Sequence, residues 1–373
     1  MKKKKTTHLH YLVILAKMVI SSRSCFLLWL CCTITGSVSV AQGNKKVKEN
    51  VLSLREDLFF MNGTGFDMWG IRVASASQSD EATDHLIAQL DDYKHYGINT
   101  IDVFFQGSSG GFSDPFLKNG SQIERGHLGR MKKILSACQS RGMVVVVGIF
   151  YQRAMADLDG VRNIADAEGV KNAVQSVAKA VRGYRNLILN IANEQNSGYY
   201  KRCEFFDFNN PENIIALCQL AKSVAPEMLV GGGGYHDESN ITIGRSPAVD
   251  VLLFDTYDLD AQNDQHSLWH YNYFTRNGVR NKPIVNVEMF GGWTKKFMPP
   301  GVFDEEGKQK HLRDADEALS TPGLYVHFHS NPWCQGPSIG KEARYDLGGM
   351  GTESEPGIRW WFDHVLRANK REW

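Results

Sequence analysis

The sequence predicts a (β/α)8 barrel, a single α/β domain of the TIM-barrel type. Eight short apolar runs, several nearly continuous in Val, Ile and Leu, are typical of parallel strands buried on both faces. Amphipathic helical patterns lie between these runs, and polar or aromatic residues follow them. The chain of 373 residues is long enough for eight strand–helix units after an N-terminal leader.

The expected strands share a high content of branched apolar residues and turn residues at their borders. In chain order they are Phe66–Val73, Ile98–Phe105, Met143–Phe150, Leu187–Ala192, Leu229–Gly232, Val249–Phe254, Pro283–Glu288 and Leu324–Phe328.

Helices are expected where apolar residues recur every three or four positions. Gly142 suits the C-terminal cap of the second helix, and Pro211 after Asn210 suits the start of the fourth. The helical patterns are Glu81–Tyr96, Leu128–Arg141, Val170–Val181, Ile214–Val224 and Ile358–Leu366.

A doubly wound open sheet is the alternative fold. It would normally carry a glycine-rich phosphate loop after its first strand. Here the first strand is followed by Ala74-Ser75-Ala76-Ser77, which lacks that pattern. The glycine run 231–234 does not fit the pattern either, and we expect it to let a strand end pass close to other backbone.

Residues 1–41 are interpreted as a secretory signal, and residues 42–373 as the catalytic domain. Lysines at positions 2–5 precede an apolar stretch, and Ser39-Val40-Ala41 resembles a signal-peptidase site. An uncleaved membrane anchor is the alternative, although the apolar run is short for a spanning helix. The protein is therefore expected to be secreted or periplasmic, to meet a membrane only through an uncleaved signal, and to be a monomer.

Charge and cysteine usage exclude several classes of partner. The net charge is +1 and falls below zero without the basic leader, and no basic stripe indicates nucleic acid. Four cysteines follow the leader without CxxC spacing, so we expect no zinc site and no cofactor. Cys138 and Cys218 lie on apolar helix faces and are expected to be buried thiols. A Cys203–Cys334 disulfide is left open.

Two glutamates stand at the ends of expected strands. Glu194 follows the fourth strand and Glu288 ends the seventh. In a barrel of this kind the active site lies at the C-terminal ends of the strands. Two carboxyls brought together there are what cleavage of a glycosidic bond requires, one to protonate the leaving oxygen and one to attack the sugar carbon.

Other polar residues are expected at the same end of the barrel, where they could bind substrate. Asn193 precedes the fourth-strand glutamate, and Tyr257 and Trp333 follow the sixth and eighth strands. The remaining candidates at strand ends are Arg72, Gln106, Tyr151, Gln152, His236 and His329.

The order of these residues resembles the clan A glycoside hydrolases, which include family 5. The resemblance covers most of residues 60–370 as an ordered pattern rather than as close identity. It implies that Glu194 is the acid/base and that Asn193 binds the sugar 2-hydroxyl. It further implies that Glu288 is the nucleophile, that Tyr257 hydrogen-bonds this nucleophile and that Trp333 floors the subsite of cleavage.

Two departures from the family 5 pattern leave the exact family open. The second strand, Ile98–Phe105, lacks the usual arginine, whose role Arg72 could fill. Asp255 stands where a histidine often precedes the sixth-strand tyrosine.

The resemblance implies a retaining mechanism on a poly- or oligosaccharide, in which the carboxyls stand ~5–5.5 Å apart. At that distance the charge of Glu288 should raise the pKa of Glu194, so that Glu194 is a proton donor near neutral pH. Two other functions remain open: a carbohydrate-binding protein without catalysis on the same scaffold, and a different, metal-dependent barrel hydrolase.

Overall fold

A computed structural model describes residues 49–107, 113–158, 160–257, 260, 263–292, 299–334 and 344–370. The expected signal, residues 1–41, and its cleavage site lie outside this described part. All structural statements below concern the described residues.

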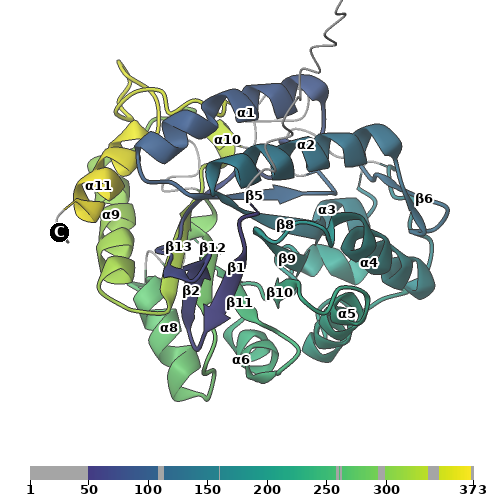
Figure 1. The fold of residues 1–373 in the computed structure, drawn as a ribbon. Helices are drawn as coiled ribbons and strands as arrows, with labels where there is room; N and C mark the ends of the chain where they lie inside the picture. Colours follow the sequence, from purple (N-terminus) through teal and green to yellow (C-terminus); the bar gives the residue numbers. More distant parts are fainter. Residues whose placement is uncertain are drawn as a thin grey trace, which may run out of the picture. The chain divides into compact units, whose positions relative to one another are not determined.

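Eight parallel strands close into a barrel, which confirms the (β/α)8 fold (Figure 1). Each predicted strand run overlaps one barrel strand, although β11 extends one residue beyond its run, and every neighbouring pair is parallel. The strands are β4 (Trp69–Arg72), β5 (Thr100–Phe104), β8 (Val144–Phe150), β9 (Leu187–Ala192), β10 (Leu229–Gly232), β11 (Val251–Asp255), β12 (Ile284–Glu288) and β13 (Leu324–Phe328).

Helices surround the barrel (Figure 1), and the five predicted from periodicity are present. Gly142 ends α2 in the left-handed conformation, and the Asn210 side chain caps the start of α5, as the sequence predicts. The longer helices are α1 (Asp80–His95), α2 (Arg125–Arg141), α4 (Ala167–Val181), α5 (Pro211–Val224), α6 (Asp237–Arg245), α8 (Ser267–Arg276), α9 (Glu305–Leu319) and α11 (Arg359–Asn369).

Three of these helices, α6, α8 and α9, were not predicted. Their apolar residues are few and interrupted: α9 buries only Gly307, His311, Asp314, Ala315 and Ala318. Its buried face therefore gives little hydrophobic periodicity in the sequence.

A small antiparallel sheet precedes the barrel and was also not predicted. It consists of β1 (Leu52–Arg55), β2 (Leu58–Met61) and β3 (Thr64–Gly65). In Figure 1 the β1–β2 hairpin, in dark purple, lies across the barrel. Leu52 and Phe59 pack with interior residues of the barrel strands, and the backbone of Leu52 bonds to Arg185 just before β9. The hairpin thus covers the N-terminal end of the barrel.

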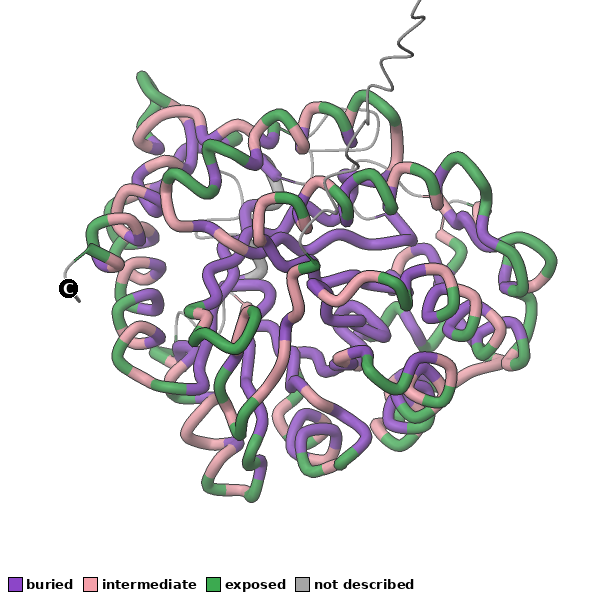
Figure 2. The backbone as a smooth tube through the Cα atoms, in the orientation of Figure 1, coloured by how far each residue is buried: buried purple, intermediate pink, exposed green. Residues whose placement is uncertain are grey.

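The barrel interior changes from apolar to polar along its axis. Val144, Val146, Ile188, Leu253 and Val285 form one apolar cluster inside the barrel. Nearer the C-terminal ends the buried residues become polar and charged, and they include Arg72, Asp102, Asp255, Glu288 and His327. Figure 2 shows the barrel strands as a buried centre with exposed residues on the outer sides of the helices.

The four cysteines that follow the leader are all buried thiols in the structure. Cys138 and Cys218 agree with the prediction. Cys203 and Cys334 do not pair with each other, so the disulfide that the sequence left open is not formed.

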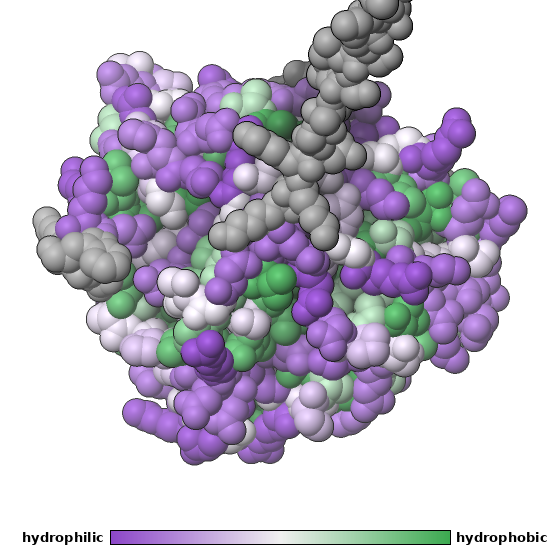
Figure 3. Space-filling view, viewed as in Figure 1, coloured by the Kyte–Doolittle hydropathy of each residue, from purple (hydrophilic) through white to green (hydrophobic). Residues whose placement is uncertain are grey.

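The face seen in Figure 3 is mainly hydrophilic, with apolar residues scattered in small groups. None of the helices in the described residues is both long and apolar enough to cross a membrane.

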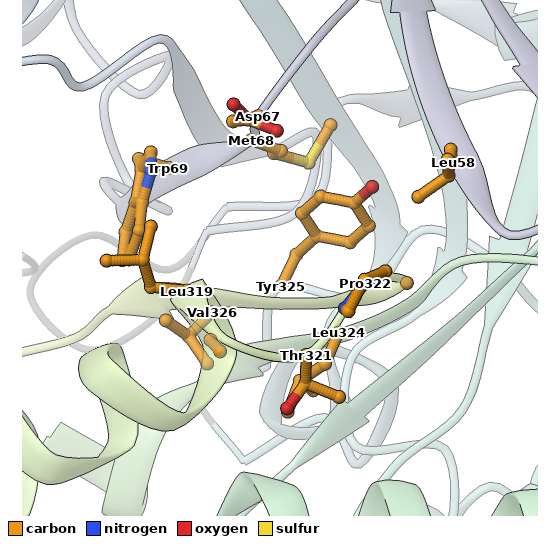
Figure 4. A pocket seen from close by; sticks show the side chains of 12 residues that line it. Leu58, Asp67, Met68, Trp69, Leu319, Thr321, Pro322, Leu324, Tyr325 and Val326 are labelled. Atoms are coloured by element: carbon orange, nitrogen blue, oxygen red, sulfur yellow. The ribbon is translucent and has the colours of Figure 1, made fainter. Parts of the chain in front are cut away.

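A cavity of about 260 Å³ lies at the N-terminal end of β4 and β13 (Figure 4). Met68, Trp69, Leu324 and Tyr325 are among the residues that line it. Because active sites of this fold lie at the opposite, C-terminal end, we assign this cavity no part in catalysis.

Candidate active site

Glu194 and Glu288 lie at the C-terminal ends of β9 and β12, and both are almost completely buried. Their exposed fractions are 8% and 4%. The backbone of Glu194 has a φ of 42°, in the left-handed region that a glutamate seldom adopts. Such strain is often found where a side chain must be aimed at a functional site. The Ser197 amide donates to the Glu194 carbonyl at 2.7 Å and stabilises this turn.

The glycine run after β10 gives this turn the space it needs. A Cβ on Gly234 would lie 2.1 Å from the Asn196 side chain and 3.1 Å from the Gln195 amide. The Gln195 amide donates to the carbonyl of Gly233. This close approach of backbone confirms the role predicted for the glycines, and it positions the segment that carries Glu194.

Glu288 lies between two basic side chains. The Arg72 guanidinium is 3.1 Å from Glu288 Oε2, and His329 Nε2 is 3.3 Å from Oε1. Burial raises the pKa of Glu288, and the charge of Arg72 opposes this rise. Burial and the same arginine hold the pKa of His329 well below its usual value, so His329 is neutral and Arg72 carries the positive charge.

Glu194 accepts hydrogen bonds from two neutral side chains. The Tyr257 hydroxyl donates to Glu194 Oε1 at 2.6 Å, and the Gln152 amide donates to Oε2. The resemblance placed Tyr257 on Glu288; in the structure its hydroxyl bonds Glu194 instead. Burial raises the pKa of Glu194 to about 8, and the charge of Glu288 adds to this increase.

An ion pair and three hydrogen bonds connect the two glutamates. Arg72 contacts Glu288 and also donates to Asn193 Oδ1. The Asn193 amide donates to Gln152 Oε1 at 2.9 Å, and Gln152 donates to Glu194. The predicted residues at the ends of β4, β8, β9 and β12 are therefore brought into a single network.

Gln106 and Tyr151 lie beside this network. Gln106 accepts from the Tyr151 amide at 2.8 Å, so it supports the backbone at the end of β8. Tyr151 is buried near both glutamates and Arg72.

Two of the predicted substrate-binding residues, His236 and Trp333, do not belong to this network. His236 is exposed at the start of α6, and its ring lies 3.5 Å from Ser239. Trp333 is only 1% exposed: its indole donates to the Asp346 carbonyl, and Arg344 lies over its ring at 4.4 Å. Trp333 therefore presents no open ring face on which a sugar could stack.

Three interior residues were not predicted as part of the site. The buried side chains of Asp102 on β5 and His327 on β13 are in hydrogen-bond contact at 2.8 Å. The Asp255 carboxyl faces the interior beside Glu288, and burial together with the Glu288 charge raises its pKa well above normal. A charged residue within an otherwise apolar strand run was the available signal for Asp102, and the departure from the family pattern was the signal for Asp255.

Comparison with known proteins gives a structural likeness only. No family model matches this chain, and no curated protein matches it. Among solved structures, a β-glucanase from Saccharophagus degradans aligns with a TM-score of 0.60 and 11% identity, over 86% of this chain and 94% of the other. A β-1,4-D-mannanase from Cryptopygus antarcticus aligns with a TM-score of 0.55 and 12% identity, over 86% and 95%.

A family 5 glycoside hydrolase from Bacteroides vulgatus aligns with a TM-score of 0.53 and 15% identity, over 76% of this chain. This chain spans only 62% of the length of that structure. At such identities the likeness concerns the fold alone. The chain shares a (β/α)8 barrel fold with these glycoside hydrolases.

Proposed function

We propose that this protein is an exported retaining glycoside hydrolase that acts on a poly- or oligosaccharide. The observation that carries the proposal is the different surroundings of two buried glutamates in one network. Glu288 is paired with a cation, which favours the ionised form that a nucleophile requires. Glu194 has a pKa of about 8, which suits a proton donor near neutral pH.

The reaction proceeds in two steps. In the first, Glu288 attacks the anomeric carbon while Glu194 gives its proton to the departing glycosidic oxygen. The glycosyl-enzyme that results has no charge on Glu288, so Glu194 no longer experiences the repulsion that raised its pKa. Glu194 can then take a proton from water, which attacks the anomeric carbon and releases Glu288.

The solved structures with the same fold guide the choice of substrates. Several are described as β-mannanases or as a β-glucanase, so β-1,4-mannan and β-glucans are the first substrates to screen. Export is part of the proposal because the basic, apolar and small-residue segments of residues 1–41 are typical of a secretory signal.

The test compares Glu194→Gln and Glu288→Gln with the exposed Glu81→Gln on α1 as control. Each of the first two should lower kcat by about 10²–10⁴-fold or more in protein that circular dichroism shows to be folded, whereas Glu81→Gln should leave kcat unchanged. Normal turnover in either glutamate variant would exclude the assignment. Glycan binding by the wild type without any turnover would indicate a binding protein instead.

The roles of the two glutamates can be separated by rescue with azide, using an activated aryl glycoside. In Glu288→Ala azide takes the place of the nucleophile, so the glycosyl azide should have inverted configuration. In Glu194→Ala azide attacks the glycosyl-enzyme, so the configuration should be retained. The opposite pairing of products would reverse the assigned roles.

A further inference from the structure

His270 lies on α8 and is buried outside the barrel strands, away from the two glutamates in sequence. Its exposed fraction is 4%, and it packs against the rings of Phe254, Trp269 and Phe274. A histidine among these aromatic residues would ordinarily be neutral. The polar contacts of His270 indicate a protonated, positively charged ring instead.

Two carboxylates face the two ring nitrogens of His270. Nδ1 is 2.9 Å from Asp237 Oδ1 at the start of α6, and Nε2 is 3.6 Å from Asp260 Oδ1 in the segment after β11. Asp314 on α9 also interacts electrostatically with His270. Burial lowers the pKa of His270, but the bonds to Asp237 and Asp260 outweigh it and raise this pKa to about 9.

Asp260 connects this cation to the active site. Its Oδ2 accepts from the Tyr257 amide at 2.5 Å, and its own amide donates to the Tyr257 carbonyl at 3.0 Å. The Tyr257 hydroxyl in turn donates to Glu194. A continuous series of polar contacts therefore runs from α6 and α8 to the proposed acid/base.

We infer that His270 is a positioning residue, which holds Tyr257 on Glu194 by bridging Asp237 and Asp260 as an imidazolium. The inference rests on the proposed glycosidase function. A hydrogen bond from Tyr257 to ionised Glu194 lowers the pKa of Glu194, as the direction of its effect shows. If Tyr257 is displaced, the pKa of Glu194 should rise further.

The test measures the upper apparent pKa in the pH profile of kcat/KM, on whichever aryl β-glycoside the wild type hydrolyses. Tyr257→Phe and His270→Gln should each raise this upper apparent pKa, and so move the alkaline limb of the profile to higher pH, by about one unit. His127→Gln serves as a matched control, since His127 is also buried, on α2, where its ring lies beside Ser77 and Phe105. The control should leave the limb in place.

The double variant His270→Gln/Tyr257→Phe separates positioning from a direct effect of charge. If His270 acts through Tyr257, the double variant should shift the limb no further than Tyr257→Phe alone. Additive shifts would mean that the imidazolium acts on Glu194 through space, and this result would overturn the inference. An unmoved limb in His270→Gln would overturn it as well.

Asp237→Asn provides a second way to weaken the bridge if His270→Gln does not fold, because Asp237 is partly exposed. It should shift the limb in the same direction. Failure of the proposed function is distinguishable, since the wild type would then show no turnover to profile. The protonation of His270 can also be followed without activity, by NMR, where a pKa near 9 is expected and a pKa below 6.5 would contradict the bridge.

Discussion

At the scale of single residues, the site depends on one arginine that serves two partners. Arg72 is fully buried, pairs with Glu288 and donates to Asn193. It also lies over the Phe104 ring, whose centroid is 5.0 Å from the guanidinium carbon. A planar guanidinium can make these contacts together, which a lysine cannot.

Replacing Arg72 with Met should therefore change both activity and stability. Without the cation, burial alone should govern the pKa of Glu288, and the lower limb of the pH profile of kcat/KM should move up by about 1–3 units. Breaking a buried ion pair also costs about 3–5 kcal/mol in the free energy of unfolding. Arg130→Met, which removes a half-buried partner of the exposed Asp80, is the control. An unmoved lower limb would contradict the assignment of Glu288 as nucleophile.

The wild type gives a prediction of its own. Because Glu194 must be protonated to act as an acid and its pKa is about 8, kcat/KM should fall as the pH rises through about 8. This fall in kcat/KM can be measured with initial rates on an aryl glycoside at a series of pH values. A fall in activity centred near pH 5 would show that the group that titrates is not Glu194.

At the scale of elements, a polar cluster between the barrel and its surrounding helices holds the backbone at the end of β12. Asn286 Oδ1 accepts from the Glu288 amide at 3.1 Å, and its Nδ2 donates to Thr256 and to Ser267. Ser267, at the start of α8, donates to the buried Asp314 of α9. The neighbouring helices thus help to fix the backbone that carries Glu288, the proposed nucleophile.

Close packing between two strands provides an element-scale prediction. A Cβ on Gly148 of β8 would lie 1.9 Å from the Phe104 ring of β5, so Gly148→Ala should destabilise the protein by about 1–3 kcal/mol. The matched control is Gly129→Ala in α2, where no atom lies within 4 Å of the new Cβ. This control should be neutral or stabilise by up to about 1 kcal/mol. Urea unfolding of both variants checks the difference; equal stabilities would contradict the packing argument.

At the scale of the whole molecule, buried carboxyls and buried histidines make stability depend on pH in opposite directions. The pKa values of Glu194 and Asp314 are raised to about 8 and 7, chiefly by burial, so the stability linked to their protons is lost as the pH rises through those values. Those of His127 and His311 are lowered to about 4, also by burial. Their unfolded forms therefore bind more protons, and stability is lost as the pH falls below about 6.5.

In scanning calorimetry between pH 4 and pH 9, the two effects should roughly offset each other below about pH 6.5, and the melting temperature should fall as the pH rises from about 6.5 to about 8. Glu194→Gln should flatten the decline on the alkaline side, because a neutral amide requires no deprotonation. A melting temperature that rises steadily to pH 9 would show that these carboxyls are not buried as described.

Which residues meet in the site was only partly readable from the sequence. Strand order and the polar strand ends were sufficient to predict that Glu194, Glu288, Asn193 and Arg72 would converge, because parallel strands of a barrel all end at one face. The hydrogen-bond and packing partners of each side chain were less predictable, since they depend on the direction in which the side chain points. Tyr257 contacts Glu194 rather than Glu288, and Trp333 is enclosed by Arg344 and the glycines at 301 and 348.

The sequence alone predicted the barrel and the approximate positions of its eight strands, because near-continuous apolar runs of strand length are typical of parallel strands covered on both faces. It also determined the two glutamates, since their places follow from the strand count. Only the tertiary structure decided the directions in which the pKa values of the two glutamates and His270 are shifted. Those depend on desolvation and on charges from distant segments, and neither effect has a period or a spacing that a sequence could show.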